Sequence, residues 1–246
     1  MSIKIETFVP ANPGNFNQTR RKLSAIKYIV IHYTGNINDT ALNNLKYFAE
    51  NDVSASAHYF CDDRGIFQSV PLEHAAYAVG LGAHRKPYTP NPPFYKKANN
   101  SNSVSIEICG SRNSNEGSEK TKENAARLCA FLMKSLNIPI TNVIRHYDVT
   151  GKRCPAWAVD SPKWDIFRLE VFSIFGGQTV NIIEFRKLYY QLMNELATEP
   201  ATAEWEINAM KEAEKNGLIN DGSPHKPVTR GELAVILQRL ESRLHK

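Results

Sequence analysis

Short apolar runs rich in β-branched residues recur along the chain and end at polar, turn-forming positions. This pattern is typical of buried strands, and three of the runs predict a strand each, at residues 24–36, 102–110 and 140–148. A fourth run, at residues 56–71, is interrupted by Asp63-Arg64-Gly65 and predicts two strands joined as a hairpin.

Between these runs lie segments whose apolar residues recur at three- and four-residue spacing, which predicts amphipathic helices at residues 38–52, 118–137 and 161–177. Polar residues that can cap a first helical turn stand at their starts, namely Asp39 or Thr40, Ser118 and Ser161. Strands that alternate with helices, with a hairpin among them, predict an α/β fold with a mixed central β-sheet flanked by helices.

Gly176 and Gly177 predict the end of the last of these helices and a domain boundary. Three further helical patterns follow the boundary, at residues 180–197, 202–216 and 229–244. We therefore expect a first domain over residues 1–177 and a small all-α module over residues 178–246. Within the first domain, residues 80–103 are rich in Gly, Pro, Asn and Ser, and a loop of this length is usually functional or disordered.

The composition is that of an ordinary globular protein, with 42% hydrophobic and 22% charged residues among 246. No apolar run approaches the roughly 20 residues that span a bilayer, so we expect no membrane insertion. The N-terminal residues lack the apolar segment and the cleavage site of a signal peptide. Synthesis in the cytoplasm without a signal peptide is therefore expected.

The net charge of +5 is unevenly distributed along the chain. Residues 178–246 carry 9 Lys and Arg against 10 Asp and Glu, whereas the residues before them carry 21 against 15. A positive first domain favours an anionic polymer as partner. The chain has no basic run interleaved with aromatic residues and no DNA-binding motif, which argues against nucleic acid. An anionic cell-wall polymer fits the charge equally well.

The stretch RHYDVTGKRCPAW, residues 145–157, places His146 and Cys154 eight positions apart in a polar, turn-forming segment. A thiolate and an imidazole together favour zinc over magnesium or calcium. The best third ligand is His32, because it ends a predicted strand and precedes a Tyr-Thr-Gly turn. Three protein ligands would leave a fourth position for water, which is typical of a catalytic zinc site.

Other interpretations of these residues stay open on spacing alone. A single histidine at a strand end is most often only a polar residue, and His58 and His74 compete with His32 as ligands. The remaining three cysteines lie in apolar patterns that predict buried, reduced thiols: Cys61, Cys109 and Cys129.

Four motifs, YIVIHYTGN, SAHYFCDDRG, SVSIEICG and RHYDVTGKRCP, stand in this order along the chain. Together they resemble the zinc-dependent N-acetylmuramoyl-L-alanine amidases of the type 2 family, which includes phage lysins, bacterial autolysins and peptidoglycan recognition proteins. The resemblance implies the amidase fold, with His32, His146 and Cys154 as ligands of Zn²⁺. It also implies that Glu107 and Lys152 act in catalysis.

The resemblance covers roughly residues 20–175 and favours one branch of the family. Some members carry a catalytic tyrosine directly before the histidine of the SAHYF motif, where this chain has Ala57. Members with an acidic residue in the SIEIC strand use that residue instead, and this chain has Glu107 there. The bacterial and Bacillus or Clostridium phage branch is therefore favoured over the animal recognition proteins.

The implied reaction is hydrolysis of the amide bond between N-acetylmuramic acid and L-alanine in peptidoglycan, which lyses the bacterial cell wall. Glu107 would act as general base and then pass its proton to the leaving amine, while Lys152 stabilises the oxyanion. The alternatives are a Glu107 that only forms a salt bridge, a non-catalytic peptidoglycan-binding protein of the same fold, and a zinc hydrolase of another amide. The likeness to phage or prophage endolysins also implies action on the wall after holin-type release.

Substrate contacts are expected along the loop at residues 80–103. His84, Arg85 and Tyr88 could meet a peptide carboxylate or stack on sugar faces, and solvated loop side chains are an equal alternative. His58 lies in a predicted strand, and we expect it to face the substrate or to support the metal ligands.

Residues 201–242 resemble a single S-layer homology motif, through the stretches EWEINAMKEAEKNGLINDG and KPVTRGELAVILQRL. Such motifs commonly bind secondary cell-wall polymers, so a polymer of this kind is a candidate partner of the C-terminal module. Proteins with this motif usually carry three copies, and this chain has one. A homodimer interface or a purely structural helical core is therefore the alternative.

Overall fold

A computed structural model of the chain describes residues 2–81, 86–159 and 162–176, together with Lys211 and Lys215. The chain divides into two units, Met1–Thr179 and Val180–Lys246. Nearly all of the second unit lies outside the described residues, so the all-α module stays a prediction. In the part of the chain that is described, no helix is both long and apolar enough to cross a membrane.

Six strands of the described residues form one mixed sheet, in the order β1, β5, β4, β7, β3, β8. Their bounds are Ile5–Phe8 (β1), Tyr28–Tyr33 (β3), Tyr59–Asp62 (β4), Gly65–Gln68 (β5), Ser103–Ile108 (β7) and Val143–Arg145 (β8). Every neighbouring pair is parallel except the β4–β5 hairpin. A second, two-stranded sheet pairs β2 (Phe16–Asn17) with β6 (Ala75–Ala76). The mixed sheet with its flanking helices confirms the predicted α/β fold.

The α-helices of the described residues are α1 (Ala41–Glu50), α2 (Glu119–Leu136), α3 (His146–Thr150) and α4 (Lys163–Phe175). Single 3₁₀ turns are η1 (Pro13–Asn15), η2 (Leu23–Ala25), η3 (Asn100–Asn102), η4 (Ile140–Asn142) and η5 (Ala156–Ala158). Two of the predicted caps are present. Thr40 Oγ1 accepts the N–H of Asn43 at 3.2 Å, and Ser118 Oγ accepts that of Thr121 at 3.1 Å. Ser161, the third predicted cap, lies outside the described residues.

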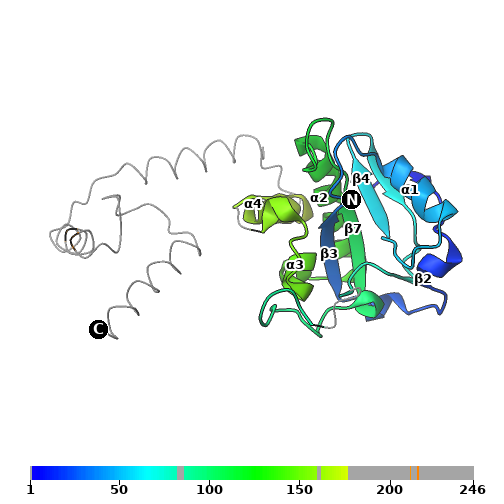
Figure 1. Cartoon of the computed structure of the whole chain (residues 1–246), viewed down its shortest axis with the longest axis horizontal. Coiled ribbons are helices and arrows are strands. Elements are labelled where there is room, and N and C mark those ends of the chain that lie inside the picture. The colour runs from blue at the N-terminus through cyan, green and yellow to red at the C-terminus, as the bar shows by residue number, and fades with distance from the viewer. Residues whose placement is uncertain (1, 82–85, 160–161, 177–210, 212–214, 216–246) are drawn as a thin grey trace. The chain divides into compact units, whose positions relative to one another are not determined.

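The two faces of the sheet are covered by different helices. Alternate residues of β3 point to opposite faces, with Ile29 and Ile31 on one side and Val30 and His32 on the other. The face of Ile29 and Ile31 packs on α2 and α4 in a large apolar core, whereas α1 packs on the opposite face through Leu45. Figure 1 shows α4 and α1 on opposite sides of the strands. His32 therefore lies on the face that α1 partly covers.

The elements differ from the predicted ones at β8 and α3, at β1, and at the short strands β2 and β6, which were not predicted. The strand predicted over residues 140–148 ends at Arg145, and His146 is the first residue of α3. Asp148 Oδ2 accepts the N–H of Arg145 at 2.8 Å, which ends the strand and starts the helical turn. β1 has no counterpart among the predicted elements, because it is a short, largely half-buried edge strand without a long apolar run.

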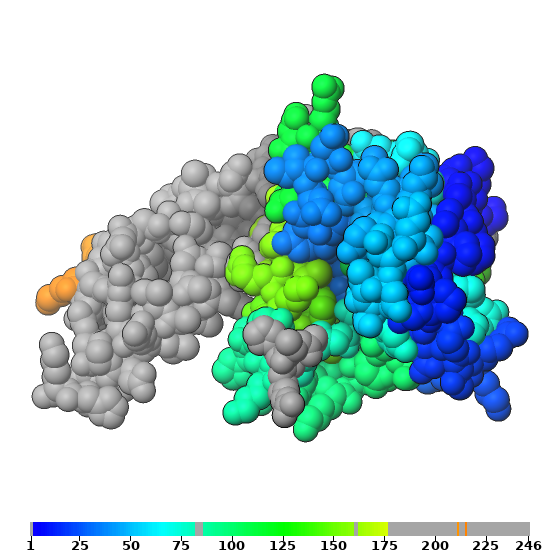
Figure 2. Space-filling view, turned by 45° about the vertical axis from the view of Figure 1, so that its right-hand side comes forward, coloured from blue at the N-terminus to red at the C-terminus, as the bar shows by residue number. Residues whose placement is uncertain are grey.

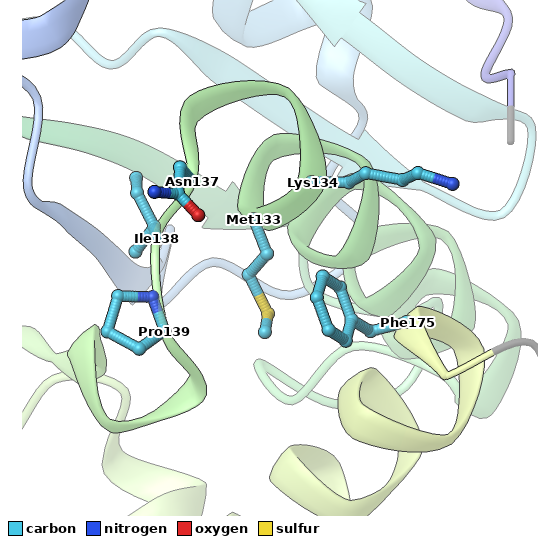
Figure 3. Close-up of a pocket in the computed structure, with 6 residues that line it drawn as sticks. All are labelled: Met133, Lys134, Asn137, Ile138, Pro139 and Phe175. Carbon is cyan, nitrogen blue, oxygen red and sulfur yellow. The ribbon is translucent and has the colours of Figure 1, made fainter.

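A hollow of about 490 Å³ lies where the C-terminal ends of α2 and α4 meet. Six residues line it: Met133, Lys134, Asn137, Ile138, Pro139 and Phe175. Figure 3 shows the Met133 side chain between Pro139 and Phe175, while the Lys134 side chain extends away from the hollow. None of the six is a predicted site residue, so this hollow is separate from the chemistry discussed below.

Candidate metal centre

The three predicted metal ligands lie at one edge of the sheet. His32 stands near the C-terminal end of β3, and His146 directly follows β8, which pairs in parallel with β3. Cys154 follows α3 on the same loop as His146. Because parallel strands end at a common edge, residues far apart in the sequence meet there. The sheet therefore assembles the candidate site from two separate segments.

The side chains of His32, His146 and Cys154 converge. One potential ligand atom from each lies within 4.8 Å of those from the other two, and all three residues are buried. Cys154 Sγ is 3.8 Å from His32 Nδ1, and the two imidazole ring centroids are 4.7 Å apart at an interplanar angle of 57°. The arrangement can hold a metal ion.

The state of the polar atoms in this cluster fits a metal ion. His32 Nε2 and His146 Nε2 are buried and have no hydrogen-bond partner among the described residues. Leaving a buried polar atom unpaired costs roughly 1–3 kcal/mol, so native proteins rarely do so without a reason. A cation bound between the three side chains would use one nitrogen lone pair from each imidazole. A set of two imidazoles and one thiol binds transition metals in preference to magnesium or calcium.

The ionisation of the two histidines suits ligation as well. Burial lowers the pKa of His146 to about 4 and the pKa of His32 well below its usual value. The positive charge of Lys152 lowers both pKa values further. Both rings are therefore neutral at pH 7, which is the form that binds metal ions.

The ionisation of Cys154, in contrast, does not by itself favour metal binding, because the thiol holds its proton. Burial, followed by the charge of Glu107, raises the pKa of Cys154 to about 12. A hydrogen bond from the backbone of Tyr33 and the charge of Lys152 act in the other direction. Because a metal ion deprotonates a thiol that coordinates it, ion binding and proton release are coupled at this residue.

Backbone hydrogen bonds hold two of the candidate ligands in place. The His146 ring is hydrogen-bonded to the backbone of Gly80. The N–H of Tyr147 donates to the carbonyl oxygen of Cys154 at 2.9 Å, which ties the two ends of the loop together. Metal-binding histidines commonly donate their second ring nitrogen in this way, which fixes the tautomer and the ring orientation.

Glu107 lies beside this cluster on β7, and its Oε2 is buried without a hydrogen-bond partner in the described part of the chain. Burial raises the pKa of Glu107 to about 7, the charge of Lys152 lowers it, and that of Asp39 raises it. A carboxyl group with this pKa can both accept and donate a proton near neutral pH. Lys152 is exposed, and its charge influences the pKa values of Glu107, His32, His146 and Cys154.

The predicted substrate-binding residues occupy different environments. His58 is 1% exposed, its Nδ1 accepts the N–H of Ser105 at 3.0 Å, and its Nε2 is 2.9 Å from Arg21 Nη2. His58 is therefore buried and hydrogen-bonded in the interior of the fold. Its role toward the substrate stays a prediction. Tyr88 is 46% exposed. His84 and Arg85 lie outside the described residues.

The loop that carries Tyr88 is attached to α3. The N–H of Tyr88 donates to the carbonyl oxygen of Thr150 at 2.8 Å, and that of Phe94 to Asp148 at 2.9 Å. In Figure 2 the yellow-green chain that follows β8 comes to the surface between the blue chain around α1 and the teal-green loop of residues 86–98. This loop therefore borders the segment that bears the candidate ligands.

Of the competing ligands, His74 does not join the cluster, since its Nδ1 lies 3.0 Å from the carbonyl oxygen of Asn17. The three other cysteines are buried free thiols, as their apolar patterns predicted: Cys61, Cys109 and Cys129. Arg145 and Asp148, which lie on either side of His146 in the sequence, were not among the predicted site residues. An Asp three residues after the last strand residue is a signal of a helix start, because its carboxylate can accept the backbone N–H of that residue, and this signal could have revealed Asp148.

Comparisons with known proteins identify the family. The family model described as N-acetylmuramoyl-L-alanine amidase matches residues 22–157, and the chain belongs to this family. N-acetylmuramoyl-L-alanine amidase CwlL of Bacillus licheniformis is 36% identical over 72% of this chain and 49% of its own length. N-acetylmuramoyl-L-alanine amidase BlyA of Bacillus subtilis is 31% identical over 74% of this chain and 50% of its own. The chain thus spans about half the length of these curated relatives.

Solved structures agree with this assignment. The structure of PlyL superimposes with a TM-score of 0.55 at 32% identity, over 70% of this chain and 97% of that one. The catalytic domain of XlyA gives a TM-score of 0.54 at 28% identity, over 69% of this chain and 99% of that one. The likeness to the XlyA structure thus extends over nearly the whole of a catalytic domain.

Proposed function

We propose that the chain is a zinc-dependent amidase that hydrolyses the bond between N-acetylmuramic acid and L-alanine in peptidoglycan. The observation that carries the proposal is the convergence of His32, His146 and Cys154, with the Glu107 carboxyl group beside them, in a member of the amidase family. The printed names of the relatives, N-acetylmuramoyl-L-alanine amidases, support the choice of substrate.

In this proposal His32, His146 and Cys154 hold Zn²⁺. When bound, zinc supplies a Lewis acid that polarises a carbonyl group and lowers the pKa of water toward about 7. The two imidazoles bind as neutral donors because burial keeps their pKa values low. The thiol of Cys154 binds as thiolate, and the nearby charge of Lys152 favours that form.

Glu107 performs the proton transfers. Its buried Oε2 takes a proton from the attacking water and passes it to the amine nitrogen of L-alanine as that group leaves. A pKa of about 7 keeps both forms of the carboxyl group accessible during the cycle. The Lys152 ammonium stabilises the negative charge that develops on the carbonyl oxygen of the scissile amide.

Two other functions are alternatives to this one. A non-catalytic peptidoglycan-binding protein of the same fold has no need of a complete donor set, whereas this chain keeps Cys154, Glu107 and Lys152. A zinc hydrolase of another amide would use the same residues, so the product must decide between the two enzymes. Only the proposed amidase frees the amino group of L-alanine.

The test is digestion of purified peptidoglycan by the full chain, with products resolved by mass and by their new N-termini, alongside metal analysis of the protein. We expect zinc near one equivalent, loss of turbidity, and a new alanine amino terminus. Cys154→Ser and Glu107→Ala should abolish lysis. Retained lysis in both variants would end the proposal, and a different new terminus would redirect it to another amide.

We further propose that residues 1–177 are the catalytic domain and that residues 178–246 bind a secondary cell-wall polymer, on the resemblance to an S-layer homology motif. Binding of the full chain and of residues 1–177 to walls with and without that polymer tests this. Polymer-dependent binding of the full chain alone supports it. A homodimer that forms only with residues 178–246 and binds no wall supports the alternative.

We propose that Tyr88, His84 and Arg85, on the loop at the site, contact the substrate and that His58 also faces it. Tyr88→Ala should raise KM more than it lowers kcat. An unchanged KM would remove Tyr88 from the substrate site. Cell-wall lysis after holin-type release stays a prediction from the resemblance to phage and prophage endolysins.

A further inference from the structure

Arg145 is a neighbour of two candidate metal ligands, His146 along the chain and His32 in the sheet. It is the last residue of β8 and directly precedes His146. In the sheet it pairs with Ile31, the residue before His32. Its side chain is only 13% exposed, which is unusual for an arginine and indicates a specific role.

One side of the Arg145 guanidinium binds Asp148. Nη2 lies 2.7 Å from Asp148 Oδ1, and Nε lies 3.2 and 3.0 Å from Oδ1 and Oδ2. Asp148 Oδ2 also accepts the backbone N–H of Arg145. The carboxylate and the guanidinium therefore fix the first turn of α3, whose first residue is His146.

The other side of the guanidinium reaches across the loop. Nη1 donates to the carbonyl oxygen of Ala158 at 2.5 Å, four residues beyond Cys154. The guanidinium also lies over the rings of Tyr147 and Trp164, at 5.3 and 5.4 Å from their centroids. The hydrogen bond from Arg145 to Ala158 thus ties together the two ends of the segment that contains His146 and Cys154.

We infer that Arg145 is a positioning residue of the metal centre, which sets the separation between the thiol of Cys154 and the two imidazoles. The inference rests on the proposed zinc site. Arginine suits this task because its planar fork can bind a carboxylate with two nitrogens while a third reaches the carbonyl oxygen of Ala158. A lysine has a single nitrogen and cannot span both partners.

Arg21 offers a matched control, because it performs a similar task away from the cluster. Its half-buried guanidinium donates to the carbonyl oxygens of Leu72, Asn100 and Ser103 at 2.8 to 2.9 Å. Ser103 begins β7, so these bonds lie at the strand end opposite to Glu107. Arg21 Nη2 also lies 2.9 Å from His58 Nε2, and neither residue belongs to the cluster of His32, His146 and Cys154. A change at Arg21 should therefore reduce stability without altering the separation of the candidate ligands.

The experiment measures Zn²⁺ affinity of the full chain by competition with a chromophoric chelator, at a temperature where every variant is folded. Cobalt-substituted protein gives a second readout, because its thiolate-to-metal absorption reports directly on the Cys154 bond. We expect Arg145→Met to bind Zn²⁺ about 10- to 100-fold more weakly, with a weakened thiolate band. Arg145→Lys should lose less, and Arg21→Met should keep the affinity and the spectrum.

Each outcome decides the matter. If Arg145→Met does not fold, the affinity and spectrum of Arg145→Lys against the parent replace it. Unchanged affinity and spectrum in the folded Arg145 variant overturn the inference and leave the amidase proposal intact. An equal loss in Arg21→Met also overturns it, since the effect would then be one of general stability. Failure of the parent chain to bind Zn²⁺ would instead refute the proposed function.

Discussion

His32 and Glu107 are direct neighbours across the parallel strands β3 and β7. Side chains at paired positions of a sheet point to the same face, so the carboxyl group of Glu107 stands next to a candidate metal ligand. The same pairing places Ile31 beside Ile106 in the apolar core on the other face. The alternation of side chains along β3 and β7 thus places the apolar core on one face of the sheet and the candidate site on the other.

Replacing Glu107 by Gln should remove proton transfer while leaving the metal ligands untouched. We expect peptidoglycan hydrolysis to fall by about 10²- to 10⁴-fold, because that is the usual contribution of a general base or acid. Zinc content should stay near that of the parent. Initial rates and metal analysis of the same preparation check both statements, and a loss of less than tenfold would contradict the role.

Removing the proposed zinc ion should weaken the fold without unfolding it, because the apolar core under α2 and α4 is independent of the cluster. Ligand at 100 times its dissociation constant stabilises a protein by about 2.7 kcal/mol. Chelation should therefore lower the melting temperature by several degrees, and Zn²⁺ should restore it. Cys154→Ser should show a much smaller response, and a response equal to that of the parent would argue against a thiolate ligand.

Gly151, which ends α3, has a φ of 77°, and a Cβ atom there would overlap Thr89. Gly35 has a similar φ of 76°, but its Cβ would meet only the Tyr33 ring at ordinary contact distances. Gly35→Ala should therefore cost about 1–2 kcal/mol for the left-handed backbone alone. Gly151→Ala should cost clearly more, because the overlap adds to it. Urea unfolding of both variants measures the difference, and equal costs would contradict the steric reason.

Glu170 on α4 should make stability depend on pH. Burial, with the charge of Glu123, raises the pKa of Glu170 to about 7, whereas Arg127 and Lys122 lower it. The folded state therefore holds this proton more tightly than the unfolded chain does. Its stabilising effect is complete below about pH 4.5 and is lost as the pH rises through 7, by on the order of 2–3 kcal/mol.

The measurement is urea unfolding of the parent and of Glu170→Gln at pH 5 and pH 8. The free energy of unfolding of the variant, relative to the parent, should rise between these two pH values, because the amide cannot ionise. Glu50→Gln, at the exposed end of α1, serves as the matched control for the substitution itself. A constant difference between parent and Glu170→Gln would contradict the raised pKa.

The longer strands and helices of the first domain were predictable because each carries its own periodicity. β3 and β7 follow from short β-branched runs, and α2 follows from its apolar spacing and its Ser118 cap. β1 was not predictable, because a short edge strand is held by pairing with β5 rather than by its own composition. The start of α3 at His146 was also missed, since the side chain of Asp148 decides it.

The sequence by itself determined which residue types are available for the chemistry, namely His32, His146, Cys154 and Glu107, and which segments carry them. It could not decide that three of them share one point, because their distance depends on the register of β3 with β7 and β8. It also gave no pKa values, since those arise from burial by distant segments. Only the tertiary structure joined Arg145 to Ala158, because a hydrogen bond across a loop depends on the path of the whole loop.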